Sequence, residues 1–306
     1  MDASRSGMSK HLLIPVDFSD SSMLAIRAGF HFARVMEVNP VILHVYPSAW
    51  YGESIDEEYL GVYDPTDEIM REAMENRDIL RIAEHRFKKF RANVNQMQQR
   101  GELPDIRYSS LLRQGVAEEE ILEYCRENDP KLVVMSTRGI NKKEEELIGS
   151  VAAEVLDSCQ VPVFTIPDNY SQEDMMHLGR FLMFCTLEQY DVLGLENMMK
   201  TFDSPKADVW LMPITHRNMI EAKAKLEQLY DKLCKAWPNI QFHQALLEES
   251  KINDQIDDFI KENKIDLVIA PNRKAGIFTR LFRPSVAHQC LFALDLPMLA
   301  LPVSKD

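Results

Sequence analysis

The chain contains an internal repeat, and this repeat limits the possible folds more than any other feature of the sequence. Residues 132–167 and 267–302 align without a gap at a separation of 135 positions. The residues that the two copies share include Leu132/Leu267, Val133/Val268, Arg138/Arg273, Ser150/Ser285, Val151/Val286, Ala152/Ala287, Pro162/Pro297 and Pro167/Pro302, with Glu127/Glu262 and Asn128/Asn263 just upstream. Because such a match needs two copies of one unit, the chain is predicted to hold two domains of one fold.

Only the first copy keeps its glycines. Gly139 and Gly149 follow an apolar run, whereas Lys274 and Pro284 occupy these places in the second copy. Backbone N–H groups can close around an anion where no Cβ intervenes, and a helix N-terminus adds its dipole. Proline removes an N–H donor and fixes φ. The first copy is therefore predicted to hold a phosphate and the second is not, so the two halves should differ in function.

Composition excludes several classes of protein. The 306 residues suffice for two domains, and 45% apolar with 27% charged residues is typical of a globular chain. The net charge of -13 argues against binding to nucleic acid or to an anionic membrane surface. No apolar run has the length of a membrane span, and the five cysteines form no C-x-x-C pair. These features favour a reduced, cytoplasmic location.

Apolar runs and helical patterns alternate along both halves. In the first half we expect strands at 11–16, 41–46, 106–112, 132–135 and 162–166, and helices at 19–36, 67–100, 117–127 and 150–158. In the second we expect strands at 180–186, 208–213, 240–246, 266–271 and 297–301, and helices at 189–202, 217–236, 252–263 and 285–293. This alternation predicts an α/β fold with two tandem doubly wound five-stranded parallel sheets. We place the domains at residues 1–168 and 178–306, joined by a polar linker.

A candidate site lies where strands end. In an open parallel sheet, ligands bind at the carboxyl ends of the strands, at the point where the strand order reverses. Asp17 ends the first strand, and residues 136–139 follow the fourth. If these strands are neighbours, a carboxylate and a phosphate cradle face one crevice. Thr186 replaces Asp17 in the second half, which loses the carboxylate together with the glycines.

These residues resemble the universal stress protein family in its tandem two-domain form. Nucleotide-binding members carry G-x2-G-x9-G-[ST] after the fourth strand, and this chain reads Ser136-x2-Gly139-x9-Gly149-Ser150, with the first glycine replaced. The start HLLIPVDFSDSS and the run VILHVY are also similar to the family's first two strands. The resemblance covers nearly the whole chain and implies a Rossmann-like fold and a stress-response regulatory role.

The resemblance also implies a ligand and its contacts. The ligand would be an adenine nucleotide, ATP, ADP or AMP, with Mg²⁺. Asp17 would accept from the adenine, Val45 would contact the ring and Gly115 would lie near the ribose. The phosphate end of the site would be formed by Ser136, Arg138, Gly139, Gly149, Ser150 and Val151. In the second half the positions of Asp17, Ser136, Gly139 and Gly149 all depart from the pattern, which would make residues 178–306 a structural domain.

Several of these residues have a plainer interpretation. Asp17 and Ser150 are equally suited to capping a helix, and Ser285 keeps the serine in the degenerate copy. Gly149 alone fits an ordinary turn. Lys142 and Lys143 would reach terminal phosphates or belong to a solvated charged loop.

The remaining candidates favour structure over chemistry. His44 and His31 fit a core or surface role better than a base or metal ligand, since each lies in an apolar or amphipathic pattern. The aromatic segment 47–66 is either a lid or an acidic surface loop.

Two functions from different classes follow. One is a nucleotide-sensing regulatory protein, and the other is a scaffold without a ligand that serves assembly and an unknown protein partner. An enzyme is the weaker hypothesis, because the chain lacks a Walker A motif, G-x-G-x-x-G and a nucleophile elbow, which leaves at most slow ATP hydrolysis. The apolar runs at 162–166 and 297–301 are expected to pair and make the chain an intramolecular pseudo-dimer; a homodimer of two chains stays open.

Overall fold

The computed structural model describes residues 10–47, 78–137, 149–168, 170, 178–185, 187, 207–213, 219–246, 252–272 and 296–302. The chain divides into two compact units, Met1–Val155 and Leu156–Asp306. Both units have an α/β fold built on a mostly parallel sheet, which confirms the predicted fold class. The predicted domain boundary within residues 168–178 stays a prediction.

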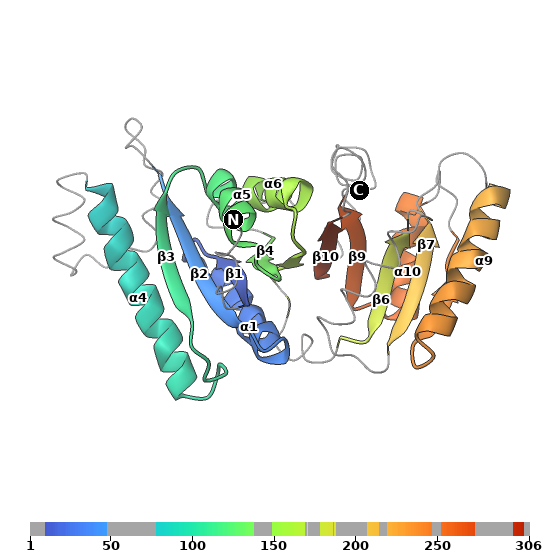
Figure 1. The fold of residues 1–306 in the computed structure, drawn as a ribbon, viewed down its shortest axis with the longest axis horizontal. Helices are drawn as coiled ribbons and strands as arrows, with labels where there is room; N and C mark the ends of the chain where they lie inside the picture. Colours follow the sequence, from blue (N-terminus) through green and yellow to red (C-terminus); the bar gives the residue numbers. More distant parts are fainter. Residues whose placement is uncertain are drawn as a thin grey trace, which may run out of the picture. The chain divides into compact units, whose positions relative to one another are not determined.

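The first unit is built on four parallel strands in the order β3-β2-β1-β4 (Figure 1). Its elements are β1 His11–Pro15, α1 Asp20–Val35, β2 Asn39–Tyr46, α4 Ile79–Gln99, β3 Ser109–Gln114, α5 Ala117–Asn128 and β4 Val133–Ser136, and α6 Ser150–Ser158 begins in it. Because β1 and β4 are neighbours although α1 to α5 separate them in sequence, the strand order reverses between them. The predicted switch point is therefore present.

Burial explains why these runs become strands. Leu12, Leu13 and Ile14 of β1 are completely buried, as expected for a central strand covered on both faces. Helix α1 lies close against this strand: a Cβ on Gly29 would come within 2.3 Å of the Ile14 side chain. Glycine is required there so that helix and strand can approach.

The boundaries of β3 and α4 differ from the predicted ones. Strand β3 begins at Ser109 instead of residue 106, because the Gln98 side chain of α4 donates to the carbonyls of Pro104 and Ile106, each at 2.9 Å. This segment is thereby tied to the helix and not to the sheet. Helix α4 begins at Ile79, after Asp78, whose carboxylate caps the N–H of Arg81 at 3.1 Å. The predicted start at residue 67 lies outside the described residues.

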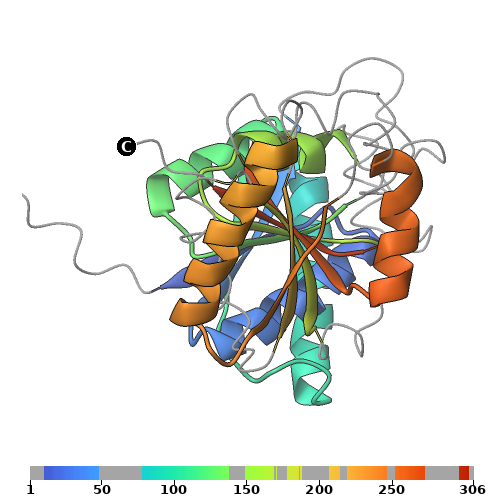
Figure 2. The same ribbon diagram turned by 90° about the vertical axis from the view of Figure 1, so that its right-hand side faces the viewer.

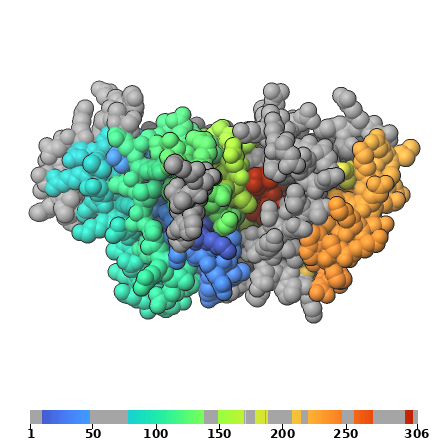
Figure 3. Space-filling model, in the orientation of Figure 1, coloured from blue at the N-terminus to red at the C-terminus, as the bar shows by residue number. Residues whose placement is uncertain are grey.

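The described residues of the second unit form six strands in the order β5-β10-β9-β6-β7-β8. They are β5 Val163–Ile166, β6 Arg180–Cys185, β7 Asp208–Pro213, β8 Gln241–Gln244, β9 Leu267–Asn272 and β10 Met298–Pro302, with helices α9 Met219–Ala236 and α10 Ile252–Asn263. Figure 2 shows α9 and α10 flanking these strands. The polar face of α9, orange in Figure 3, lies at the surface. The helices expected at 189–202 and 285–293 lie outside the described residues.

One pairing in this unit is antiparallel. Strand β10 pairs with β5, with Leu299 opposite Phe164 and Ala300 opposite Val163. All four side chains are essentially buried. The last strands of the two repeat copies therefore pair with each other.

Candidate functional site

The carboxyl ends of β1, β2 and β3 bring three predicted site residues to one edge of the first sheet. The N–H of Val16 donates to Leu43 O at 2.8 Å, which places Asp17 beside the end of β2. The N–H of Gly115 donates to Tyr46 O at 2.9 Å, so Gly115 lies beside the last residue of β2. Asp17 and Gly115 therefore follow β1 and β3, and Val45 lies near the end of β2 between them.

The fourth strand adds the start of a helix. Ser136 ends β4, and the carbonyl of the buried Thr137 accepts the N–H of Gly149 at 2.8 Å. The carbonyl of Gly149 in turn accepts from Ala153 N–H at 3.0 Å, which is the first helical hydrogen bond of α6. Gly149 consequently takes the N-cap place, and Ser150 and Val151 form the first turn. The alternative of Ser150 as the N-cap is wrong for this reason.

Asp17 anchors the start of α1. Its Oδ1 accepts from the N–H of Ser19 at 3.1 Å, from the Ser19 hydroxyl at 2.5 Å and from the Ser22 hydroxyl at 2.6 Å. Ser19 is the N-cap of α1, and its Oγ accepts the N–H of Ser22 at 3.2 Å. The carboxylate thus plays the capping role that was one of its two interpretations. Its contact with adenine stays a prediction.

Phe18 follows Asp17 in a left-handed conformation, with φ of 69°. This turn directs its ring onto His44, with centroids 3.9 Å apart, and onto Phe90 of α4 at 5.4 Å. The guanidinium of Arg86 lies 5.1 Å from the Phe18 centroid. Left-handed backbone is unfavourable for a non-glycine residue, so tertiary packing must hold it. Neither the conformation nor the ring cluster was predicted from the sequence.

His44 is a buried histidine, as the structural interpretation predicted. Its Nδ1 lies 2.8 Å from Val16 O, so Nδ1 carries the proton and Nε2 is a bare acceptor. Nε2 is buried and has no hydrogen-bond partner among the described residues. Burial lowers the pKa of His44 to about 4, helped by Arg86, while the bond to Val16 and the charge of Asp17 act in the opposite direction. The neutral His44 ring therefore holds the residue after β1 through this hydrogen bond.

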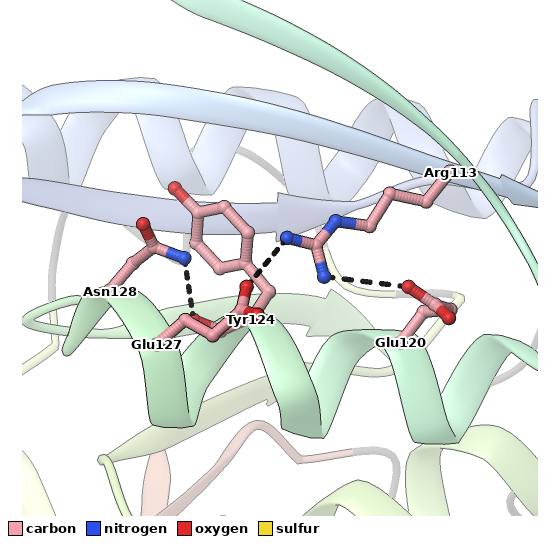
Figure 4. A network of polar contacts seen from close by, with 5 residues as sticks. All are labelled: Arg113, Glu120, Tyr124, Glu127 and Asn128. Carbon is pink, nitrogen blue, oxygen red and sulfur yellow. Dashed lines mark hydrogen bonds and ion pairs between the residues drawn. The ribbon is translucent and has the colours of Figure 1, made fainter.

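A polar network supports the loop of Gly115 (Figure 4). Arg113 of β3 pairs with Glu120 at 3.4 Å and with Glu127 at 2.8 Å, and its guanidinium lies 5.4 Å from the Tyr124 ring centroid. The hydrogen bond to Glu127 is the main cause that raises the pKa of Arg113. Glu120 also packs on Gly115, because a Cβ there would lie 2.8 Å from its Cγ. Charge pairing on α5 thus shapes the loop expected near the ribose.

Some predicted site residues fall outside the described part of the chain. Arg138, Gly139, Lys142 and Lys143 are among them, as is the aromatic segment apart from Pro47. Their predicted contacts with phosphate stay predictions.

The second unit repeats the backbone geometry but not the chemistry. Leu187 has φ of 61° at the place that Phe18 holds in the first unit. Pro271 stands at the place of Ser136 and lies within β9, where it pairs with Leu301. The turn after the first strand is therefore common to both copies, while the polar groups around it are not.

Two kinds of feature are absent from the described residues. No helix among them combines the length and the apolar character that a membrane crossing requires. Nowhere in the same ranges do three His, Cys, Asp or Glu side chains gather as a metal-binding group. Of the cysteines in the described ranges, Cys125, Cys159 and Cys185 are buried and Cys234 is partly exposed.

Comparison with known proteins decides the family. The family model described as "Universal stress protein family" matches residues 8–167, which is half of the chain. The chain belongs to the universal stress protein family. The match spans the four strand ends and the start of α6, so the candidate site lies within the residues that the family model covers.

Individual members of the family match to different extents. Universal stress protein YxiE of Bacillus subtilis is 28% identical over 163 residues, covering 52% of this chain and 99% of its own length. Universal stress protein MJ0577 of Methanocaldococcus jannaschii is 24% identical over 163 residues, covering 52% of this chain and 95% of its own length. A universal stress protein from Archaeoglobus fulgidus covers 97% of this chain and 99% of its own, with a TM-score of 0.62 and 16% identity, which shows a common fold.

Proposed function

We propose that residues 1–168 bind an adenine nucleotide, ATP, ADP or AMP, and that this binding regulates a stress response. Residues 178–306 are proposed to be a structural partner domain. The observation that carries the proposal is the convergence of Asp17, Val45, Gly115 and the α6 start at the carboxyl ends of adjacent parallel strands. This is the edge at which open α/β sheets bind ligands.

The described residues suit the parts of a nucleotide. Half-buried Val45 and Ser136 at the sheet edge offer a partly apolar surface to a base. The N–H groups of Ser150 and Val151 belong to the first turn of α6, where a helix has no acceptor of its own to offer them. They would donate to phosphate oxygens, with the helix dipole in support. Gly149 would act differently from the family expectation, because its N–H is already bonded to Thr137 O.

Mg²⁺ belongs to the proposal as a companion of the phosphates. Magnesium in nucleotide sites is usually held by phosphate oxygens and water with one or two protein ligands. Such a site needs no preformed cluster of carboxylates. The Mg²⁺ ion would also neutralise the charge of the phosphates, which would otherwise be repelled by a chain of net charge -13.

Calorimetric titration of MgATP into the nucleotide-free protein tests the proposal. We expect one site per chain, because the second copy lacks both glycines and the carboxylate. Two sites would show that the second copy also binds. No heat of binding at millimolar nucleotide would refute the proposal.

Three variants separate recognition by Asp17 from its capping role. Asp17→Ala removes both, Asp17→Asn keeps one acceptor oxygen, and Ser22→Ala weakens the cap while keeping the carboxylate. We expect affinity to fall most in Asp17→Ala, less in Asp17→Asn and least in Ser22→Ala. Equal losses in Asp17→Ala and Ser22→Ala, with equal losses of stability, would mean that Asp17 acts only through α1.

One observation favours the alternative of a ligand-free scaffold. Both Asp17 Oδ1 and the Gly149 N–H, which a ligand would be expected to use, already have partners within the protein. A scaffold would keep such an internally bonded edge for stability alone. The same titration distinguishes the two functions, since a scaffold gives no heat with any adenine nucleotide.

A further inference from the structure

An aromatic pair lies on β7 and β8, the two strands at the outer edge of the second unit's sheet. The rings of Trp210 on β7 and His243 on β8 are stacked, with centroids 4.5 Å apart and planes 19° apart. Trp210 is 9% exposed, while the His243 side chain is 40% exposed. The partly exposed imidazole of His243 therefore covers one face of the buried Trp210 indole and extends the aromatic surface to the solvent.

The repeat shows that this pair is specific to the second unit. Val133 and Val268 correspond in the sequence repeat. From these two residues, the strand pairing of each sheet shows which residues of the two units occupy the same position. Successive neighbours across the sheet are Val133, Leu13, Val41 and Ser109 in the first unit, and Val268, Leu182, Trp210 and His243 in the second. A small pair, Val41 and Ser109, therefore stands where the second unit has two rings. The copy that lost its glycines has gained an aromatic platform elsewhere.

A pocket opens beside this platform. Its volume is about 560 Å³, and besides Trp210 and His243 it is lined by Tyr230 of α9, Phe242 and Gln244 of β8, and Phe259 and Asn263 of α10. Tyr230 and Phe259 are only half-buried, so their rings are partly open to it. Ligand pockets usually measure about 300–1,000 Å³ and combine aromatic walls with a few polar groups. This pocket has both properties.

The polar groups of the pocket define the charge of its ligand. Among the described residues that line it there is no lysine or arginine, so they offer no permanently charged cation to a phosphate or carboxylate. The Asn263 amide donates from Nδ2 to Phe259 O at 2.8 Å, which leaves its Oδ1 as the atom that it presents. The Asp208 carboxylate lies 3.4 Å from His243 Nε2 at the same end of the strands. Acceptors next to a ring platform suit a ligand with N–H donors.

We propose that this pocket, built around Trp210 and His243, binds a planar nitrogen heteroaromatic compound that carries N–H donors and is neutral or cationic. The ring stacks on the exposed face of His243, and an N–H group of the ligand donates to the amide oxygen of Asn263. Aromatic stacking of this kind favours offset rings 4.5–7 Å apart. The site lies within the second unit, and its ligand class excludes the phosphates expected in the first.

A small probe tests the ligand class. The probe is 2-aminobenzimidazole, which is planar and bears N–H donors, and binding is followed by NMR of the indole N–H of Trp210. We expect saturable shifts with a Kd on the order of 1 mM, as for a ligand of about ten heavy atoms. Benzoate, a planar anion, and methylguanidine, a cation without an aromatic ring, should bind at least about tenfold more weakly. Equal binding of benzoate, or shifts that never saturate, would overturn the proposal.

The first unit supplies matched variants. His243→Ser and Trp210→Val each introduce the residue that the first unit holds at the corresponding position. Loss of one stacking partner should weaken the probe roughly five- to tenfold. Ser109→Ala in the first unit is the control and should leave the affinity unchanged. The His243 side chain is well exposed on the edge strand β8, so His243→Ser should leave the fold intact. This variant therefore tests the site even where Trp210→Val unfolds the unit. Unchanged affinity in His243→Ser would refute the site, whatever the nucleotide titration shows.

Discussion

At the scale of single residues, the most informative position is the one after Asp17. Phe18 and Leu187 correspond in the two units, and both adopt a left-handed backbone, with φ of 69° and 61°. A conformation that is unfavourable for both side chains is kept in both copies, so the turn is needed for the fold and not only for a ligand. In the first unit this turn also carries the Phe18 ring onto His44.

His44 makes the first unit sensitive to acid. Its pKa is about 4 in the folded chain against 6.5 for an ordinary histidine. Below pH 6.5 His44 becomes protonated in the unfolded chain, whereas in the folded chain it stays neutral down to about pH 4. The contribution of His44 to the free energy of unfolding is therefore complete above pH 6.5 and falls as the pH falls. Asparagine can keep the donor to Val16 O without titrating. Between pH 7 and 5, urea unfolding should show a loss about 2 kcal/mol greater in the native chain than in His44→Asn. Parallel losses in the two proteins would contradict this assignment.

At the scale of elements, the repeat is clearest where α5 and α10 end. Asn128 donates to Tyr124 O at 3.0 Å and Asn263 to Phe259 O at 2.8 Å, so corresponding amides close both helices. The next residue is left-handed in each, Asp129 with φ of 45° and Lys264 with φ of 52°. Such a residue ends a helix and directs the chain into the following strand. Identical helix ends therefore place β4 and β9 in the same way.

Gly115 links a strand end to this helix. Its φ is 155°, which L side chains rarely adopt, and a Cβ would lie 2.8 Å from Glu120 Cγ. Gly115→Ala should therefore lower the free energy of unfolding by about 1–2 kcal/mol. Gly101→Ala is the matched control, since Gly101 has φ of 74° and open space around its Cβ position. It should cost about 1 kcal/mol, the lower end of the range, because only the left-handed backbone is strained there. Denaturant unfolding measures both. If Glu120→Ala fails to reduce the cost of Gly115→Ala, the contact with Glu120 is not its cause.

At the scale of the whole molecule, the pairing of β5 with β10 matters most. It joins the last strands of the two copies through buried residues such as Phe164 and Leu299. A strand that is paired on this edge cannot pair with a second chain. Duplication therefore provides within one chain a contact that would otherwise need two.

This pairing predicts a monomer in solution. Sedimentation or light scattering at micromolar concentration should give a mass of about 35.3 kDa, that of one chain. A stable species of twice this mass would contradict the prediction and would show that another edge or face associates.

The sequence alone was enough for the family, the fold and the position of the site edge. Repeat spacing, apolar periodicity and the Gly149-Ser150 pattern are local in sequence, and β1, α1, α6 and α10 begin and end within about two residues of their predicted bounds. Asp17 was singled out because it ends a predicted strand, while Val45 and Gly115 were expected from the family resemblance. They lie at strand ends, which topology brings together in any sheet of this class.

Only the tertiary structure decided how most of those residues are used. Gly149 is bonded to Thr137, and Gly115 packs on Glu120, which pairs with Arg113 of β3, so both depend on partners that packing brings near. The same holds for Trp210 and His243, which become neighbours only through strand register. Asp17 is different, because the two serines whose hydroxyls it accepts from lie two and five residues further along the chain. Local pattern determines which elements form, while register and burial between distant segments determine which side chains meet.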